Sequence, residues 1–175
     1  GFVRQGAIVH FIDLVDDVSA SLDTGVLGQK PVFHKCDLTD TPLLEKTLAA
    51  ILADGPVHIL LNNAARDDRH SLSEVTSEFF DANIAVNLKH MAMCTRAVAP
   101  GMKAAGGGAI LNFGSISWHL GLPDLVLYET AKAAIEGFTR ALARELGPDN
   151  IRVTTIIPGN VKTKRQEKWY TPEGE

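Results

Sequence analysis

The segment NFGSISWHLGLPDLVLYETAK, residues 112–132, decides how the rest of the chain is interpreted. It places Ser115 thirteen residues before Tyr128, and Tyr128 four residues before Lys132. If the segment is helical, Tyr128 and Lys132 project from one face. A lysine ammonium beside a phenol favours the phenolate and lowers the tyrosine pKa from about 10. The pattern predicts a general acid/base that exchanges a proton with a substrate oxygen; alone, it is more typical of an exposed helix face.

The composition indicates an ordinary globular domain and argues against several other protein classes. The 175 residues are 45% hydrophobic and 22% charged, and the formal net charge is −4, which suits one domain with a buried core. Scattered basic residues argue against nucleic acid as a partner. No apolar run approaches the roughly 20 residues of a membrane helix, and the first residues lack a signal-peptide pattern. We therefore expect a cytoplasmic protein without a membrane segment.

The cysteines and histidines point to no special chemistry. Cys36 and Cys94 have no CxxC spacing and are expected to be buried thiols in a reducing compartment. The six histidines show neither HxxxH nor HExxH spacing, so we expect no metal site.

Short apolar runs alternate with helical segments along the chain. The expected strands are residues 7–12, 32–38, 57–61, 109–113 and 151–157; the expected helices are 16–23, 40–54, 74–104 and 126–146. Pro100 should kink or end the third helix, and Ala134, Ile135, Phe138, Ala141 and Leu142 should share one face of the last. Continuous apolar strands joined by helices are typical of a parallel sheet covered on both faces. Residues 1–175 are thus expected to form one α/β domain with a doubly wound, Rossmann-like sheet.

In such sheets, ligands bind outside the carboxyl ends of the strands, where the polar residues of this chain gather. Asp13 ends the first strand and suits the adenosine ribose hydroxyls, while it would repel a 2′-phosphate, which favours NAD over NADP; a solvated charge or a helix cap is the alternative. Asp37 and Leu38 can bracket an adenine, although a helix-capping role explains Asp37 equally well. Asn63 can hydrogen-bond across strands or to a ribose, and the adjacent alanines, Ala64 and Ala65, allow the backbone to approach a cofactor.

Together these motifs resemble the short-chain dehydrogenase/reductase family. The resemblance rests on the segments Asn62–Ala65, Asn87 in AVNL, Ser115, Tyr128-x-x-x-Lys132 and Pro158-Gly159, with 28 residues between Asn87 and Ser115. It implies that Tyr128 is the catalytic acid/base and that Lys132 lowers its pKa and binds the nicotinamide ribose. Ser115 would hold the substrate oxygen, and Asn87 would keep a water in the proton relay. The residues expected along the nicotinamide, which does the redox work, are Pro158, Gly159, Val161 and Thr163.

Two features depart from the family pattern. Ala65 stands where glycine is usual, and no G-x-x-x-G-x-G motif occurs in the chain. The first strand and its glycine-rich loop are expected before Gly1, and the final strand and helix after Glu175. The sequence is thus expected to be an internal fragment of a protein of roughly 250 residues. Without the pyrophosphate-binding loop, this polypeptide is expected to bind NAD poorly.

Within the family, residues 67–70, 113–132 and 158–175 resemble bacterial NAD-dependent D-xylose 1-dehydrogenases and neighbouring aldose dehydrogenases. This implies hydride transfer from the C1 hydroxyl of an aldose, expected to be D-xylose, to NAD, giving the lactone. The expected substrate contacts are Ser115, Ser117, Trp118, Tyr128 and Asn160, with His119, Lys162, Gln166 and Trp169 as further candidates. Each also has a structural explanation, such as a cleft wall, a lid or a solvated charge.

Two other functions stay open. The chain can be a short-chain reductase of another alcohol or ketone, which the polar segment Asp67–His70 argues against, or a catalytically inactive fragment with exposed sheet edges. The resemblance also implies a homo-oligomer, a dimer or a tetramer, paired through the helices 74–104 and 126–146. The apolar faces of these helices can equally be used by the sheet.

Overall fold

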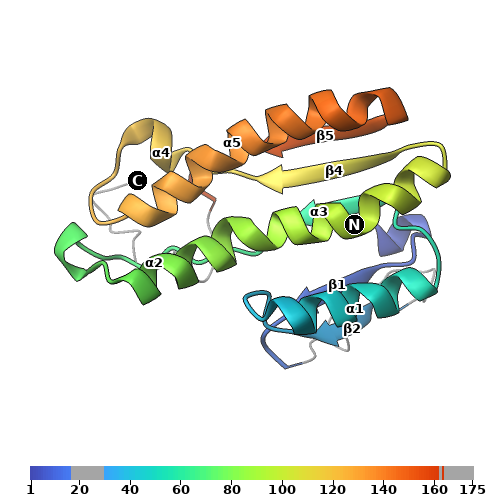
Figure 1. Ribbon diagram of the computed structural model, residues 1–175, viewed down its shortest axis with the longest axis horizontal. Helices are drawn as coiled ribbons and strands as arrows, with labels where there is room; N and C mark the ends of the chain where they lie inside the picture. Colours follow the sequence, from blue (N-terminus) through green and yellow to red (C-terminus); the bar gives the residue numbers. More distant parts are fainter. Residues whose placement is uncertain (17–29, 162, 164–175) are drawn as a thin grey trace.

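The computed structural model describes residues 1–16, 30–161 and 163. The expected helix 16–23, apart from Asp16, and the substrate candidates Lys162, Gln166 and Trp169 lie outside these residues. The strands are β1 (His10–Asp13), β2 (Val32–Lys35), β3 (Ile59–Asn62), β4 (Gly108–Phe113) and β5 (Ile151–Ile156). The α-helices are α1 (Thr41–Ala53), α2 (Ser77–Ile84), α3 (His90–Ala104), α4 (Ser117–Leu120) and α5 (Val126–Leu146), as Figure 1 shows.

All described strand pairs are parallel. β1 pairs with β2, and β3, β4 and β5 pair in that order, so the described strands form two sheets rather than one. Helices α2 and α3 connect β3 to β4, and α4 and α5 connect β4 to β5. Parallel strands with helical crossovers confirm the expected α/β, Rossmann-like fold class.

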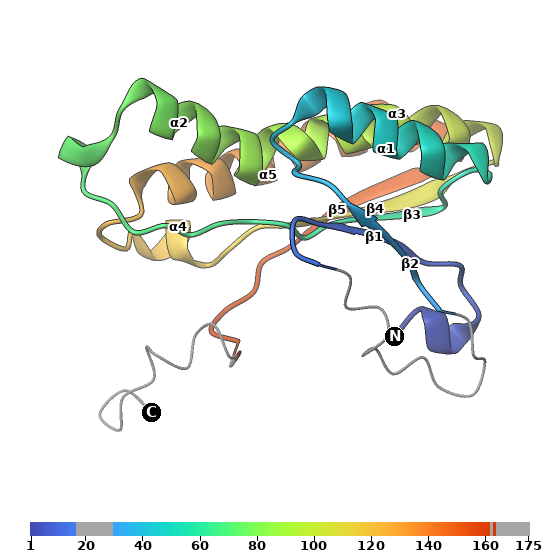
Figure 2. The ribbon, with the colours of Figure 1, turned by 90° about the horizontal axis from the view of Figure 1, so that it is seen from below.

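The long helices lie on one face of the strands. Figure 2 shows α1, α2, α3 and α5 together along one side of the strands. Successive residues of a strand point to opposite faces, and β5 follows this rule, with Ile151 and Val153 buried and Arg152 exposed. On the other face, Ile59 and Leu61 are 46% and 41% exposed. Of the two helix layers expected from the apolar strands, the described residues therefore supply one.

Two apolar clusters join this helix layer to the sheets. Val98 and Met102 of α3 pack on Ile110 of β4 and on β5. The second cluster consists of Cys36, Leu44, Leu48 and Cys94. Both cysteines are free and buried, as expected, and burial raises the pKa of the Cys94 thiol to about 11. Burying a leucine side chain fully contributes about 1.5–3 kcal/mol, so these clusters fix α1 and α3 on the strands.

The expected helix 74–104 is divided. It consists of a short 3₁₀ turn (Leu72–Glu74), α2, a π-helical turn at Ala85–Lys89 and then α3. Pro100 lies inside α3, which continues to Ala104, so the expected local end does not occur. The Pro100 side chain is exposed, and the helix is fixed by the packing of Val98 and Met102 on both sides of it. This packing outweighs a proline cost of about 3 kcal/mol.

Helix α5 has the expected bounds, and its buried face matches the expected one only in part: Ile135 is buried, and Ala134, Phe138 and Leu142 are half-buried. Its buried residues are Leu127, Ala131, Lys132, Ile135 and Thr139. Ala141, expected on this face, is exposed. The apolar pattern was misleading because the buried face carries a lysine and a threonine, which a count of apolar residues does not include. None of the helices that the structure describes is long and apolar enough to cross a lipid bilayer.

Candidate active site

The loops that follow β4 and β5 are joined by backbone hydrogen bonds. The Gly114 N–H donates to the Ile156 carbonyl at 2.9 Å, and the Ile116 N–H donates to the Pro158 carbonyl at 3.1 Å. Parallel strands present their carboxyl ends at one edge of the sheet, so Ser115 and Pro158 come together there. Ser115 Oγ accepts a hydrogen bond from the Ser117 N–H at 3.2 Å, which fixes the hydroxyl at the end of β4.

Lys132 is the most deeply buried charged side chain of the described residues, with 2% of its surface exposed. Its Nζ donates a hydrogen bond to the Phe113 carbonyl at 2.6 Å and lies 5.4 Å from the centroid of the Tyr128 ring. Burial lowers the Lys132 pKa to about 8, and the negative charge of Asp67 opposes the shift. Tyr128 and Lys132 therefore share one face of α5, as their spacing predicts, and Lys132 joins that face to the end of β4.

Asn87 lies in the π-helical turn and is fully buried. Its Oδ1 accepts a hydrogen bond from the Arg66 N–H at 2.8 Å. Its Nδ2 donates to the Arg66 carbonyl and to Asn83 Oδ1, both at 3.0 Å. Single-turn π-helical insertions are frequent at functional sites. Here the insertion directs an asparagine against the loop that follows β3.

A line of buried polar side chains crosses the sheet below this edge. Asn62 Nδ2 donates to Asn112 Oδ1 at 2.8 Å, and Asn112 Nδ2 donates to Thr139 Oγ1 at 2.9 Å. The cross-strand bond considered for Asn63 is thus made by Asn62, whereas Asn63 is exposed. The reason is the two-residue period of a strand, which turns Asn62 inward with Leu60. Thr139 was not predicted as part of this line. Its position seven residues, or about two helical turns, after Lys132 places it on the same face of α5, and this spacing could have identified it.

Asp13 ends β1, as expected, and Asp37 lies two residues after the end of β2. Both carboxylates accept backbone hydrogen bonds. Asp13 Oδ1 accepts from the Leu14 N–H at 2.7 Å. Asp37 Oδ1 accepts from the N–H and the hydroxyl of Thr39 at 2.9 and 2.7 Å, and these bonds lower the pKa of Asp37. The N-cap of α1 is Asp40, so the alternative role of Asp37 as the helix cap is wrong. Leu38 is half-buried against the Cys36 cluster.

The segment after Ser115 is tied to α5 by Glu136. Glu136 Oε1 accepts from the Trp118 indole N–H at 2.8 Å and lies 3.1 Å from His119 Nε2. The two rings are tilted, with centroids 3.9 Å apart. Ser117 is 6% exposed. Glu136 was missed in the sequence, although its spacing of four residues from Lys132 places it on the same side of the helix.

The remaining expected site residues lie near the same edge. Ala64 and Ala65 follow β3 and are half-buried, and Pro158 is half-buried; the exposed residues after it are Gly159, Asn160, Val161 and Thr163. Within residues 1–16, 30–161 and 163, no cluster of three or more His, Cys, Asp or Glu side chains suits a metal ion.

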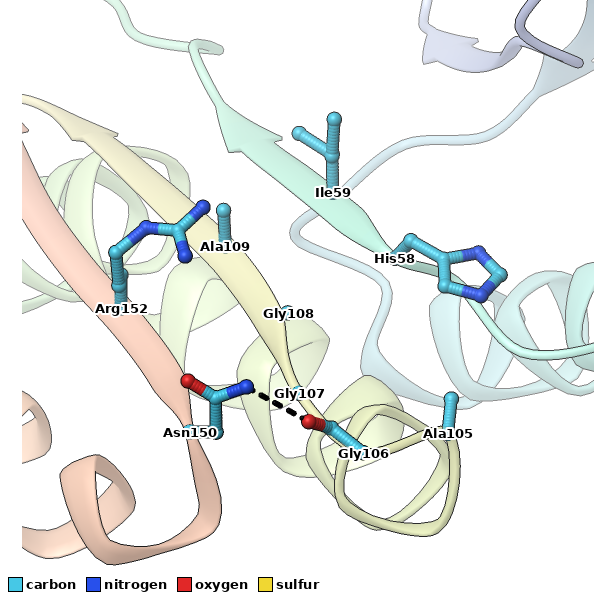
Figure 3. Close-up of a pocket in the computed structure, with 9 residues that line it drawn as sticks. All are labelled: His58, Ile59, Ala105, Gly106, Gly107, Gly108, Ala109, Asn150 and Arg152. Atoms are coloured by element: carbon cyan, nitrogen blue, oxygen red, sulfur yellow. Dashed lines mark hydrogen bonds between the residues drawn. The ribbon is translucent and has the colours of Figure 1, made fainter.

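A pocket of about 340 Å³ lies at the opposite ends of the strands. Figure 3 shows it around His58, Ile59, Ala109 and Arg152, with the Asn150 amide bonded to the Gly106 carbonyl. These residues begin β3, β4 and β5 or immediately precede them. The pocket is therefore separate from the edge that carries Ser115 and Pro158.

Comparison with known proteins decides the family. The family model described as short chain dehydrogenase matches residues 1–174. The chain belongs to this family. It is 62% identical over 177 residues to the D-xylose 1-dehydrogenase of Caulobacter vibrioides, with 100% of this chain and 70% of that protein covered. It is 45% identical to a probable galactose dehydrogenase of Rhizobium meliloti, with 98% and 69% covered.

A solved structure agrees with this assignment. The NADH-dependent reductase A1-R′ in complex with NAD superposes with a TM-score of 0.82 at 26% identity, over 91% of this chain and 71% of that one. The expected resemblance to short-chain dehydrogenases and to D-xylose 1-dehydrogenases is confirmed. The protein is an oxidoreductase of a family that uses a nicotinamide cofactor. The residues present fit such a group: the buried Lys132 ammonium lies beside the Tyr128 ring and bonds the carbonyl of Phe113, which ends β4, and the carboxylate of Asp13 stands at the end of β1.

Proposed function

We propose that the protein oxidises the C1 hydroxyl of an aldose to the lactone, with D-xylose as substrate and NAD as cofactor. The main support for this reaction is the buried Lys132 ammonium, which donates a hydrogen bond to the Phe113 carbonyl and lies 5.4 Å from the centroid of the Tyr128 ring. The proposal that the substrate is an aldose is supported by the 62% identity to a D-xylose 1-dehydrogenase and the 45% identity to a probable galactose dehydrogenase.

Tyr128 takes the proton of the C1 hydroxyl. With a pKa of about 8, Lys132 is largely charged at pH 7, and a positive charge at this distance favours the phenolate. The protein thus supplies a base at the edge where β4 ends. NAD, when bound, would supply the acceptor for the hydride that leaves C1, which is the redox part of the reaction.

Ser115 steadies the substrate oxygen as it becomes a carbonyl. Its Oγ already accepts a hydrogen bond from the Ser117 N–H, so its own hydrogen is directed to another acceptor. Asn87 holds a water that carries the proton away from Lys132. Both hydrogens of its amide are used by Arg66 and Asn83, so the second lone pair of Oδ1 is the group that receives this water.

The cofactor is held by residues from several strand ends. Lys132 and Tyr128 bind the nicotinamide ribose, and Asp13 binds the adenosine ribose. Because the Asp13 carboxylate repels a 2′-phosphate, NAD is preferred over NADP. The residues that would hold the adenine and the rest of the cofactor are Asp37, Leu38, Asn63, Ala64, Ala65, Pro158, Gly159, Val161 and Thr163.

The sugar lies between Ser115 and the residues that follow it. The bond from the Trp118 indole N–H to Glu136 orients the indole ring, and this ring stacks on the apolar face of the pyranose. Ser117 and Asn160 donate or accept hydrogen bonds at the sugar hydroxyls.

We also propose a cytoplasmic homo-oligomer, a dimer or a tetramer. A groove of about 430 Å³ lies between α3 and α5; its lining includes the apolar residues Ala99, Phe138 and Leu142 and the charged residues Arg96 and Glu145. A second copy offers the same apolar strip and both charge signs, so the groove suits a two-fold contact. Leu142→Arg should yield a monomer by light scattering, whereas Arg140→Glu on the exposed side should not.

A substrate panel with Tyr128→Phe tests the activity. In the complete protein, D-xylose and NAD should support turnover, and simple apolar alcohols should not. Tyr128→Phe should remove turnover and largely spare NAD binding by titration calorimetry. Turnover within tenfold of wild type in this variant, or preference for an apolar ketone, would contradict the proposal; the latter result would favour the alternative reductase.

A further inference from the structure

His70 is a buried histidine outside the residues assigned to the reaction. It lies in the segment between β3 and α2, and 5% of its surface is exposed. Its backbone forms a parallel bridge with Leu125, and its N–H donates to the Asp124 carbonyl at 2.9 Å. The ring packs edge-on against Phe79, with centroids 4.9 Å apart and an interplanar angle of 67°. His70 thus links the segment after β3 to the start of α5.

Both ring nitrogens of His70 have a defined partner. Nδ1 lies 2.8 Å from the Asp68 carbonyl, and the Leu127 N–H points at Nε2 from 3.3 Å. A carbonyl only accepts and a backbone N–H only donates. Nδ1 therefore carries the hydrogen and Nε2 offers its lone pair, so the two contacts select one neutral tautomer.

The contact with Leu127 compensates for a missing cap on α5. The first N–H groups of a helix have no partner within the helix, and the N-cap residue Leu125 makes no side-chain capping bond. Glu129 instead folds back to the Leu122 N–H at 2.8 Å, and His70 accepts from Leu127. Leu127 immediately precedes Tyr128, so the imidazole fixes the backbone from which the Tyr128 side chain starts.

The same ring fixes the segment that faces Lys132. Asp68, whose carbonyl accepts from Nδ1, is adjacent to Asp67, whose charge acts on Lys132. Arg69 Nη1 donates to the Pro123 carbonyl at 3.1 Å and holds this segment on the start of α5. One imidazole therefore sets the backbone on both sides of the Tyr128–Lys132 pair.

We propose that His70 is a positioning residue, which fixes the first turn of α5 through Leu127 and so places the Tyr128 hydroxyl for proton transfer. The inference rests on the proposed role of Tyr128 as the base. A displacement of about 1 Å in a reacting group can reduce turnover by about 10²-fold. A single hydrogen bond beside the base is therefore sufficient to affect kcat without contact with the substrate.

Two conservative variants separate the two bonds. In His70→Gln the side-chain oxygen reaches the position of Nε2 and still accepts from Leu127. In His70→Asn the amide nitrogen takes the position of Nδ1 and still donates to Asp68, but nothing reaches Leu127. We expect kcat to fall about 10- to 100-fold in the Asn variant and less than about fivefold in the Gln variant, with KM for the sugar little changed. The matched control is His58→Asn, an exposed histidine at the other end of β3, which should keep wild-type kcat.

Hydrogen exchange of the Leu127 amide gives a readout without turnover. The amide should be protected in wild type and in His70→Gln, and exchange about tenfold faster in His70→Asn. Equal kcat or equal Leu127 exchange in the two variants would overturn the proposal. A protein that shows this exchange pattern but turns over no aldose contradicts the aldose assignment alone. In that case, the positioning role is judged from the Leu127 exchange and from kcat with the alcohol or ketone that the substrate panel identifies.

Discussion

Replacing Lys132 with methionine should remove turnover without destabilising the fold. The Lys132 pKa falls from 10.5 to about 8 because the side chain is buried. At 1.36 kcal/mol per pH unit, this means that burying the charged form costs about 3 kcal/mol at pH 7. Methionine removes that cost but also the bond to the Phe113 carbonyl, and a hydrogen bond to a charged group contributes about 1.5–3 kcal/mol. The free energy of unfolding at pH 7 should therefore be unchanged or rise by up to about 1.5 kcal/mol.

The pH dependence provides the sharper test. The folded-state pKa lies below the unfolded one, so the fold prefers the neutral amine. The cost of the charge is fully present below pH 8 and disappears as the pH rises toward 10.5. Urea unfolding of wild type and Lys132→Met from pH 7 to 10 should show wild type gaining stability relative to the variant. Lys103→Met, at an exposed ion pair with Asp149, is the control and should show no such trend. A loss of more than about 2 kcal/mol at pH 7, as for ordinary core truncations, or a difference that does not vary with pH, would refute the reasoning.

Three further outcomes follow from the described contacts. Ring nitrogens of His34 and His10 lie 3.0 Å apart, and burial, followed by the charge of His10, lowers the pKa of His34. The stability that the neutral form contributes is present above pH 6.5 and is lost as the pH falls. In melts at a series of pH values, His34→Asn should therefore lose less stability than wild type as the pH falls. Thr139→Val leaves the Asn112 amide without its buried acceptor and should cost about 1–3 kcal/mol in urea unfolding; a change below about 0.5 kcal/mol would show that water replaces the hydroxyl. Asp13→Asn should raise the ratio of kcat/KM for NADP to that for NAD by at least about tenfold, since it removes the negative charge at the ribose; an unchanged ratio would remove Asp13 from the cofactor site.

The sequence was sufficient for the fold class and for the Tyr128–Lys132 face of α5. Both follow from periodicity, since apolar strands and a four-residue spacing depend on local geometry. The sequence did not show whether Asn62 or Asn63 makes the cross-strand hydrogen bond. That depends on which residues of β3 face the helices, and tertiary packing decides this. The π-helical turn at Asn87 was also invisible, since it inserts one residue without changing composition.

The cap supplied by His70 shows a second limit. It joins residues 57 positions apart, and no local pattern signals a bond between a loop and the first turn of a distant helix. Pro100 shows the opposite case: the local helix end that a proline can cause does not occur, because packing on both sides of it continues α3 to Ala104. Features that depend on one element are predictable from the sequence, whereas those that depend on how two elements meet are set by the tertiary structure.

The buried line Asn62–Asn112–Thr139 has a consequence for how the chain finds its alignment. A shift of β3 by one residue against β4 would turn Asn62 to the other face and leave the Asn112 oxygen without its donor. Such a misaligned sheet would bury an unpaired amide at a cost of about 1–3 kcal/mol. The line thus discriminates against slipped pairings during folding. Because the line ends on Thr139 of α5, it also aligns the end of β4, from which Ser115 follows three residues after Asn112, with the helix that carries Tyr128.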